Sequence, residues 1–77
     1  MLEEIAREIA AATKDRRKAV TIHFQVLKNA DQLSGMDAIE FCRRVGIEEV
    51  WATEFKKMIN LAKLLREQGL ELAPRRD

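Results

Sequence analysis

Residues 38–55 read AIEFCRRVGIEEVWATEF, and this stretch decides the fold. Apolar residues recur at intervals of three and four on both sides of Gly46, which predicts two helices that meet at a sharp bend. Glycine readily adopts the left-handed backbone conformation that such a bend requires. Cys42 is small enough to let the second helix approach the first, and Val45 and Ile47 supply apolar contacts at the turn. The spacing predicts a helix-turn-helix unit.

The same periodicity extends outward over the rest of the chain. It predicts an all-α fold, a compact bundle of four helices with the helix-turn-helix unit at its core, over residues 2–12, 15–31, 36–45 and 48–68. Thr13 and Asp15 are helix-capping residues, so the first two helices are either separated there or continuous. Ser34 and Asp37 have the spacing of a loose capping box before the third helix.

Length and composition bound the fold further. A chain of 77 residues, 47% of them hydrophobic, fits one helical domain over residues 1–70. Residues 71–77 contain the only proline and two arginines, and we expect them to form a frayed tail. A chain this short can bury only a small hydrophobic core. With a single cysteine it also has no internal disulfide to stabilise it. We therefore expect efficient helix packing, pairing into a homodimer, or both.

The net charge, the counts of cysteine and histidine, and the N-terminal sequence argue against several classes of protein. A net charge of +1 removes the simplest argument for a nucleic-acid-binding protein, a strongly basic domain. One cysteine and one histidine are too few for a zinc site built from these residues, so no metal or cofactor is predicted. The apolar runs are too short to span a membrane, and the acidic, amphipathic start differs from a signal peptide. We expect a cytoplasmic protein.

The side chains that could take part in catalysis or ligand binding are better explained as parts of the hydrophobic core. His23 lies within the apolar arc of the second helix, which favours a partly buried core histidine over a ligand. Cys42 is placed as a small core residue, and Trp51 as a core anchor rather than an exposed contact for a partner. Phosphate-binding loops, dinucleotide fingerprints and nucleophile elbows are absent from the sequence. We therefore predict no catalytic residues and no enzyme.

A resemblance to a known family adds to this interpretation. Its residues are Ile22-His23-Phe24, Asn29-Ala30-Asp31, the segment 41–47, the segment 52–57, and Leu61-Ala62. With these the chain resembles small bacterial helix-turn-helix-like proteins over about residues 18–68. The resemblance implies a helical fold and a protein that binds DNA or assists a regulatory system.

The leading functional hypothesis is a small DNA-binding or transcription-associated protein. A recognition helix presents its first turns to base edges and phosphates. The predicted nucleic-acid-binding residues are Arg43, Arg44, Lys56 and Lys57 at phosphates, Thr53 in the groove of double-stranded DNA, and Arg16 and Arg17 on the same side. Glu48, Glu49 and Glu54 in the same region oppose a polyanion unless each finds a donor. Pairing of two copies would present two half-sites.

The alternative is a protein–protein adaptor without nucleic-acid binding. Its contact surface would be the apolar face of the fourth helix or the stripe formed by Leu2, Ile5 and Ile9. One continuous basic face favours DNA, whereas scattered cations around an exposed apolar patch favour a protein partner.

Overall fold

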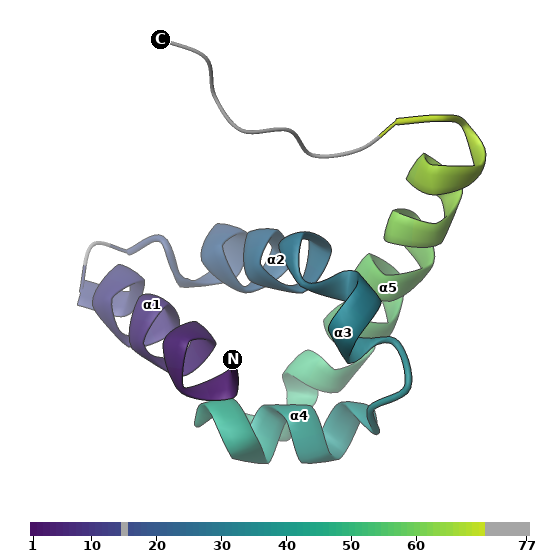
Figure 1. The fold of residues 1–77 in the computed structure, drawn as a ribbon. Helices are drawn as coiled ribbons and strands as arrows, with labels where there is room; N and C mark the ends of the chain where they lie inside the picture. The colour runs from purple at the N-terminus through teal and green to yellow at the C-terminus, as the bar shows by residue number, and fades with distance from the viewer. Residues whose placement is uncertain (15, 71–77) are drawn as a thin grey trace, which may run out of the picture.

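The computed structural model describes residues 1–14 and 16–70, and every regular element in these residues is a helix (Figure 1). The elements are α1 (Leu2–Lys14), α2 (Lys18–Lys28), α3 (Ala30–Leu33), α4 (Ala38–Val45), the 3₁₀ turn η1 (Glu49–Trp51) and α5 (Ala52–Glu67). The prediction of an all-α bundle built on four longer helices is confirmed. Among the described residues, no helix is both long and apolar enough to cross a membrane. The predicted tail, residues 71–77, lies outside the described residues.

A break separates α1 from α2, which settles the alternative left open by the sequence. Arg16 adopts a left-handed conformation with φ 59°. The Arg17 backbone N–H donates to the Ala12 carbonyl at 2.9 Å, and the Arg16 N–H donates to the Thr13 carbonyl at 3.3 Å. This pair of bonds is a Schellman motif, which satisfies the last carbonyls of α1 and turns the chain back.

The second predicted helix, over 15–31, is shorter than expected. It begins at Lys18 and ends at Lys28, and the single-turn helix α3 follows. The Asn29 side chain donates to the Gln25 carbonyl at 2.9 Å, and the Asn29 backbone N–H donates to the same oxygen. Because the asparagine side chain bonds locally to the backbone, it favours an end to the helix at this point.

The bend at Gly46 is confirmed. Gly46 has φ 76° and the Ile47 N–H donates to the Cys42 carbonyl at 2.9 Å, so α4 also ends in a Schellman motif. At the other end of α4 the cap is Asp37 alone, whose carboxylate accepts from the Glu40 N–H at 3.0 Å. The capping role predicted for Ser34 is therefore wrong, because this residue lies at the C-terminal end of α3.

The fourth predicted helix begins with one turn of 3₁₀ helix instead of α-helix. The Trp51 N–H donates to the Glu48 carbonyl at 3.0 Å in η1, and α5 then runs from Ala52 to Glu67. Gly69 ends this helix as predicted, with φ 74°. The α-helix α5 thus starts four residues later than the periodicity indicated, because the 3₁₀ turn η1 occupies the residues directly before it.

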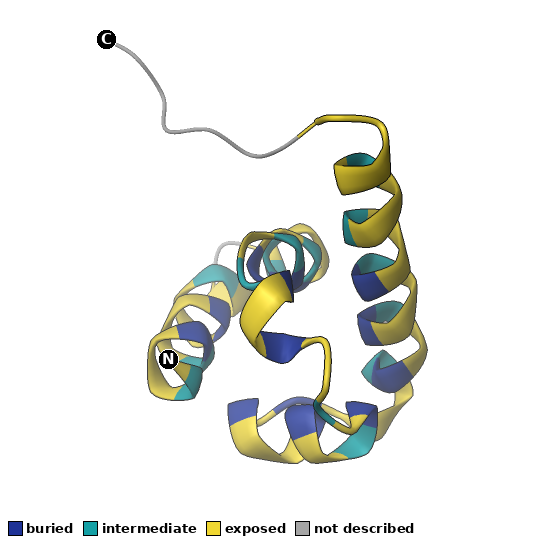
Figure 2. Cartoon of the chain, turned by 45° about the vertical axis from the view of Figure 1, so that its right-hand side comes forward, coloured by how far each residue is buried: buried dark blue, intermediate teal, exposed yellow. Residues whose placement is uncertain are grey.

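The core lies where α1, α2, α4 and α5 meet, and Figure 2 shows its residues on the facing sides of these helices. Phe41 and Phe55 stack at its centre with ring centroids 4.5 Å apart. Ile5 and Ile9 are only 1% and 2% exposed. The adaptor surface predicted on α1 is therefore wrong, since its apolar stripe packs inside this molecule. On the predicted apolar face of α5, Phe55 and Ile59 are buried as well, whereas Leu61 at its edge is exposed.

Candidate nucleic-acid interface

The N-terminal half of α5 has one buried side and one exposed side. The buried residues are Ala52, Phe55 and Ile59. The exposed residues of the same turns are Thr53, Lys56, Lys57 and Asn60. Because the bend at Gly46 anchors the apolar side against α4, the polar side faces solvent directly after the turn. This is the arrangement that a recognition helix requires.

Asn60 joins the three predicted residues on this exposed side and is not among the residues predicted from the sequence. It follows Lys56 by one helical turn and Thr53 by two, and that spacing is the signal that places it on their side. Asn60 and Lys56 also line a depression of about 310 Å³ against the connection before α4, with Ser34 and Asp37 on its other wall.

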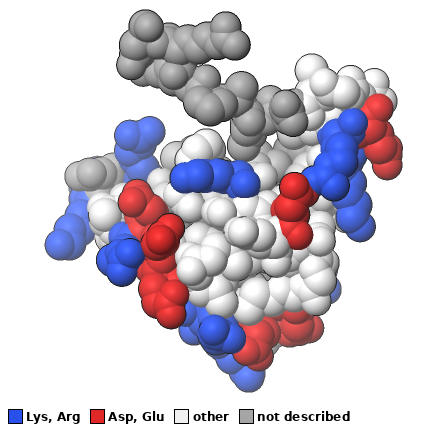
Figure 3. Space-filling model, viewed as in Figure 1, with Lys and Arg blue, Asp and Glu red and all other residues white. Residues whose placement is uncertain are grey.

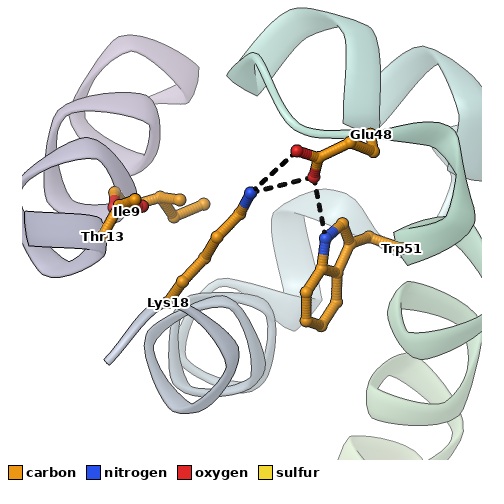
Figure 4. A network of polar contacts seen from close by, with 5 residues as sticks. All are labelled: Ile9, Thr13, Lys18, Glu48 and Trp51. Carbon is orange, nitrogen blue, oxygen red and sulfur yellow. Dashed lines mark hydrogen bonds and ion pairs between the residues drawn. The ribbon is translucent and has the colours of Figure 1, made fainter. Parts of the chain in front are cut away.

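Glu48 lies immediately before η1 and is held by two donors from different elements (Figure 4). Lys18 Nζ lies 2.9 and 3.1 Å from its two carboxylate oxygens, and Trp51 Nε1 donates to Oε2 at 3.0 Å. The hydrogen bond from Lys18, followed by a backbone hydrogen bond, lowers the pKa of Glu48 below its usual range. The start of α2 is thus tied to the turn that leads into α5.

The other two glutamates also have partners within the chain. Arg43 at the end of α4 donates from Nε and Nη2 to Glu49 Oε1, at 3.2 and 3.0 Å. Glu54 lies 3.5 Å from His23 Nε2 and 3.9 Å from Lys57 Nζ. His23 Nε2 is buried and has no hydrogen-bond partner among the described residues, while the ring lies edge-on to Trp51. His23 is therefore partly buried, as predicted, and it faces α5.

The remaining predicted cations lie at different places. Arg44 pairs with Glu40 at 3.6 Å and approaches α1. The pKa of Glu3 is lowered chiefly by a backbone hydrogen bond and the N-terminal ammonium group, and to a smaller extent by Arg44. Arg16 and Arg17 are exposed and directly precede Lys18, which reaches the turn.

The structure therefore groups Thr53, Lys56 and Lys57 on α5, with Arg43 at the adjoining turn. It places Arg44 on the side of α1. On the face in Figure 3, lysines and arginines alternate with acidic residues, so this face carries no continuous patch of one sign.

Cys42 and Trp51 have the structural roles predicted for them. Cys42 is fully buried, and burial, with smaller contributions from Glu49 and Glu48, raises the pKa of its thiol. Trp51 is half-buried and packs against the core, while its N–H donates to Glu48. Within residues 1–14 and 16–70, no three histidine, cysteine, aspartate or glutamate side chains gather as they would around a metal ion.

When the chain is compared with known proteins, it matches a family model but no individual curated protein or solved structure. No match to the chain was found among curated proteins or among solved structures. A family model described as HTH-like domain matches residues 1–68, which include the bend at Gly46 and the exposed side of α5. The chain therefore belongs to the HTH-like domain family.

Proposed function

We propose that the chain binds double-stranded DNA with the exposed side of the N-terminal half of α5 in the major groove. The observation that supports this proposal most directly is that α5 has an exposed polar side soon after the left-handed turn at Gly46. It presents Thr53 and Asn60, which have groups suited to base edges, and Lys56 and Lys57, which are suited to phosphates. Arg16, Arg17 and Arg43 contact phosphates beside the turn, and Arg44 makes at most a peripheral contact.

The three glutamates around the start of α5 are compatible with this function because each has a cationic partner. Lys18 binds Glu48, Arg43 binds Glu49, and Lys57 lies near Glu54. These pairs reduce the repulsion of a polyanion, but they also occupy three of the nearby cations. Exposed ion pairs are worth little, so Arg43 and Lys57 can exchange a carboxylate for a phosphate. We therefore expect modest affinity that falls steeply with salt.

In this proposal the protein is a regulator and not an enzyme. A single copy reads only a few base pairs, whereas two copies related by a two-fold axis read two half-sites one helical turn apart. Pairing therefore belongs to the proposed function, and it allows weak contacts by each copy to give useful affinity for a specific site.

Fluorescence anisotropy with labelled duplex DNA of random sequence, measured over a salt series, tests the proposal. We expect log affinity to fall linearly with log salt concentration. Replacing Lys56 and Lys57 together by glutamate is expected to abolish binding. The milder change of both to alanine should reduce the salt slope by about two, one for each phosphate contact.

The matched control is the pair Arg7→Glu and Lys28→Glu. Both residues are exposed and line a depression between α1 and α2, so this variant changes the net charge equally at a different surface. We expect it to retain most of the binding. The proposal fails if affinity is independent of salt, or if the control variant loses as much affinity as the variant of Lys56 and Lys57.

The adaptor function has one observation in its favour. The apolar stripe of α1 and the inward residues Phe55 and Ile59 of α5 are buried, but Leu61 and Leu64 are exposed towards the other end of α5 and Leu70 just beyond it. An adaptor would show no DNA binding at low salt and would lose its partner when these leucines are replaced.

A further inference from the structure

Val50 is the most exposed large hydrophobic residue in the described part of the chain, at 77%. It is the middle residue of η1, the turn between the bend at Gly46 and the start of α5. A single exposed apolar side chain is common on protein surfaces, so the exposure alone indicates no binding site. The position of Val50 is informative because both of its neighbours in η1 are held by other residues of the chain.

These two neighbours fix the direction of η1. Glu49 accepts two hydrogen bonds from Arg43, at 3.2 and 3.0 Å. Trp51 packs against the core and donates its indole N–H to Glu48 at 3.0 Å (Figure 4). Val50 lies between them, and its β-branched side chain has few rotamers. The turn therefore presents a rigid apolar group, and such a group loses little conformational entropy when it binds a partner.

Val50 also lies on the proposed DNA-binding side of the molecule. Thr53 follows it by three residues and Lys57 by seven, which is the spacing of residues on one side of a helix, and all three are exposed. Cations suited to phosphates therefore occur on both sides of Val50 in the sequence, at Arg43 before it and at Lys57 after it. An apolar group near cations matches the major groove, where the methyl group of a thymine lies between two rows of phosphates.

We propose that Val50 recognises a thymine in the major groove by packing against its C5-methyl group. Among the four standard bases only thymine carries this methyl group, and it is the apolar feature that a base pair presents in the major groove. A valine has no hydrogen-bonding group in its side chain, so an apolar contact is the base recognition for which it is suited. This inference rests on the proposed function and deepens it, because it assigns the class of DNA, a site with an A·T pair opposite η1.

Selection of duplexes from a random library with the full chain at low salt, followed by fluorescence anisotropy on the selected sequence, tests the inference. We expect a thymine at a fixed position of the selected site. Replacing this thymine by uracil removes the methyl group and keeps the pairing with adenine. The replacement should weaken binding of the wild-type chain about fourfold, the effect of one buried methyl group. It should leave the affinity of the Val50→Ala variant unchanged.

Val20→Ala is the matched control, because Val20 is also exposed but lies on α2. This variant should keep the full preference for thymine over uracil. On duplexes of random sequence, Val50→Ala should bind as tightly as the wild type, since the valine contacts no phosphate. Far-UV circular dichroism verifies that both variants keep their helices.

The possible outcomes separate this inference from the proposed function. DNA binding without any preference for thymine over uracil overturns the inference and leaves the proposed function standing. The inference also fails if Val50→Ala keeps the wild-type preference at every selected thymine, or if Val20→Ala loses it equally. A chain that binds no duplex even at low salt overturns the inference and the proposed function together.

Discussion

Lys18 and Glu48 are thirty residues apart in the sequence, yet Lys18 Nζ lies within 3.1 Å of both carboxylate oxygens of Glu48. The same carboxylate accepts the indole N–H of Trp51 at 3.0 Å. One glutamate thus connects the start of α2 with the turn before α5. Because the proposed DNA-binding side of α5 begins at that turn, this connection helps to fix its direction relative to the rest of the bundle.

The first prediction concerns this ion pair. Lys18→Met and Glu48→Gln, alone and combined, form a double-mutant cycle that isolates the coupling in the free energy of unfolding. The lowered pKa of Glu48 means that the carboxylate is stabilised in the folded state. At neutral pH, which is above the pKa of Glu48 in the unfolded chain, the Glu48 carboxylate therefore stabilises the folded state. This stabilisation is lost as the pH falls through the pKa of Glu48 in the folded protein.

Urea unfolding of the four proteins at pH 7 and at decreasing pH measures this coupling. We expect a favourable coupling at pH 7 that disappears in acid. Because both side chains are near the surface, added salt should weaken it as well. A coupling that grows on acidification would contradict the geometry.

The second prediction concerns the bend. An added Cβ at Gly46 meets no heavy atom of the described residues within 4 Å, but the glycine has φ 76°. Gly46→Ala should therefore destabilise the protein through backbone strain alone, by about 1–2 kcal/mol. In a domain of this size that corresponds to a decrease in Tm of roughly 4–8 °C for each kcal/mol.

Gly35→Ala is the control for that variant, because Gly35 also has free space around it and its φ is not positive. This substitution should be neutral or slightly stabilising, since alanine restricts the unfolded chain. Equal losses of Tm in the two variants would show that the left-handed turn is not the cause.

The third prediction concerns Arg16, a residue other than glycine at φ 59°. Arg16→Gly relieves the strain in the cap of α1, while it adds freedom to the unfolded chain. The net effect should be stabilisation by up to about 1 kcal/mol, measured by thermal unfolding. In the proposed function the same variant should bind DNA more weakly, because it lacks one phosphate contact. Destabilisation would indicate that the arginine side chain makes a contact worth more than the strain.

The sequence predicts the helices well where the signal is local. Gly46 and Gly69 end their helices as expected, because glycine adopts the left-handed conformation at little cost. The break before α2 could only be left as an alternative, since an arginine rarely occupies the same conformation. The end of α2 at Lys28 cannot be predicted from the sequence, because it depends on a side-chain hydrogen bond of Asn29 within an otherwise continuous apolar pattern.

The candidate site is less predictable, because its electrostatics depend on tertiary structure. The sequence identified Glu48 and Glu54 as obstacles to DNA binding, but only the fold brings Lys18 and His23 to them from α2. Asn60 has a helical spacing that was visible in the sequence, yet it carries no charge and gave no separate signal.

The last prediction tests Cys42 as a structural residue. Its thiol is fully buried, and its pKa is raised by burial and by the nearby carboxylates of Glu49 and Glu48, so little thiolate is available to react. A thiol reagent should therefore modify Cys42 only when the domain opens, and the rate should rise with urea in parallel with global unfolding. Ser34→Cys, which adds an exposed thiol, is the internal reference and should react at once. If Cys42 of the native protein reacted as quickly as that reference, the thiol would be reachable in the folded state, and a chemical role for this residue would replace the structural one.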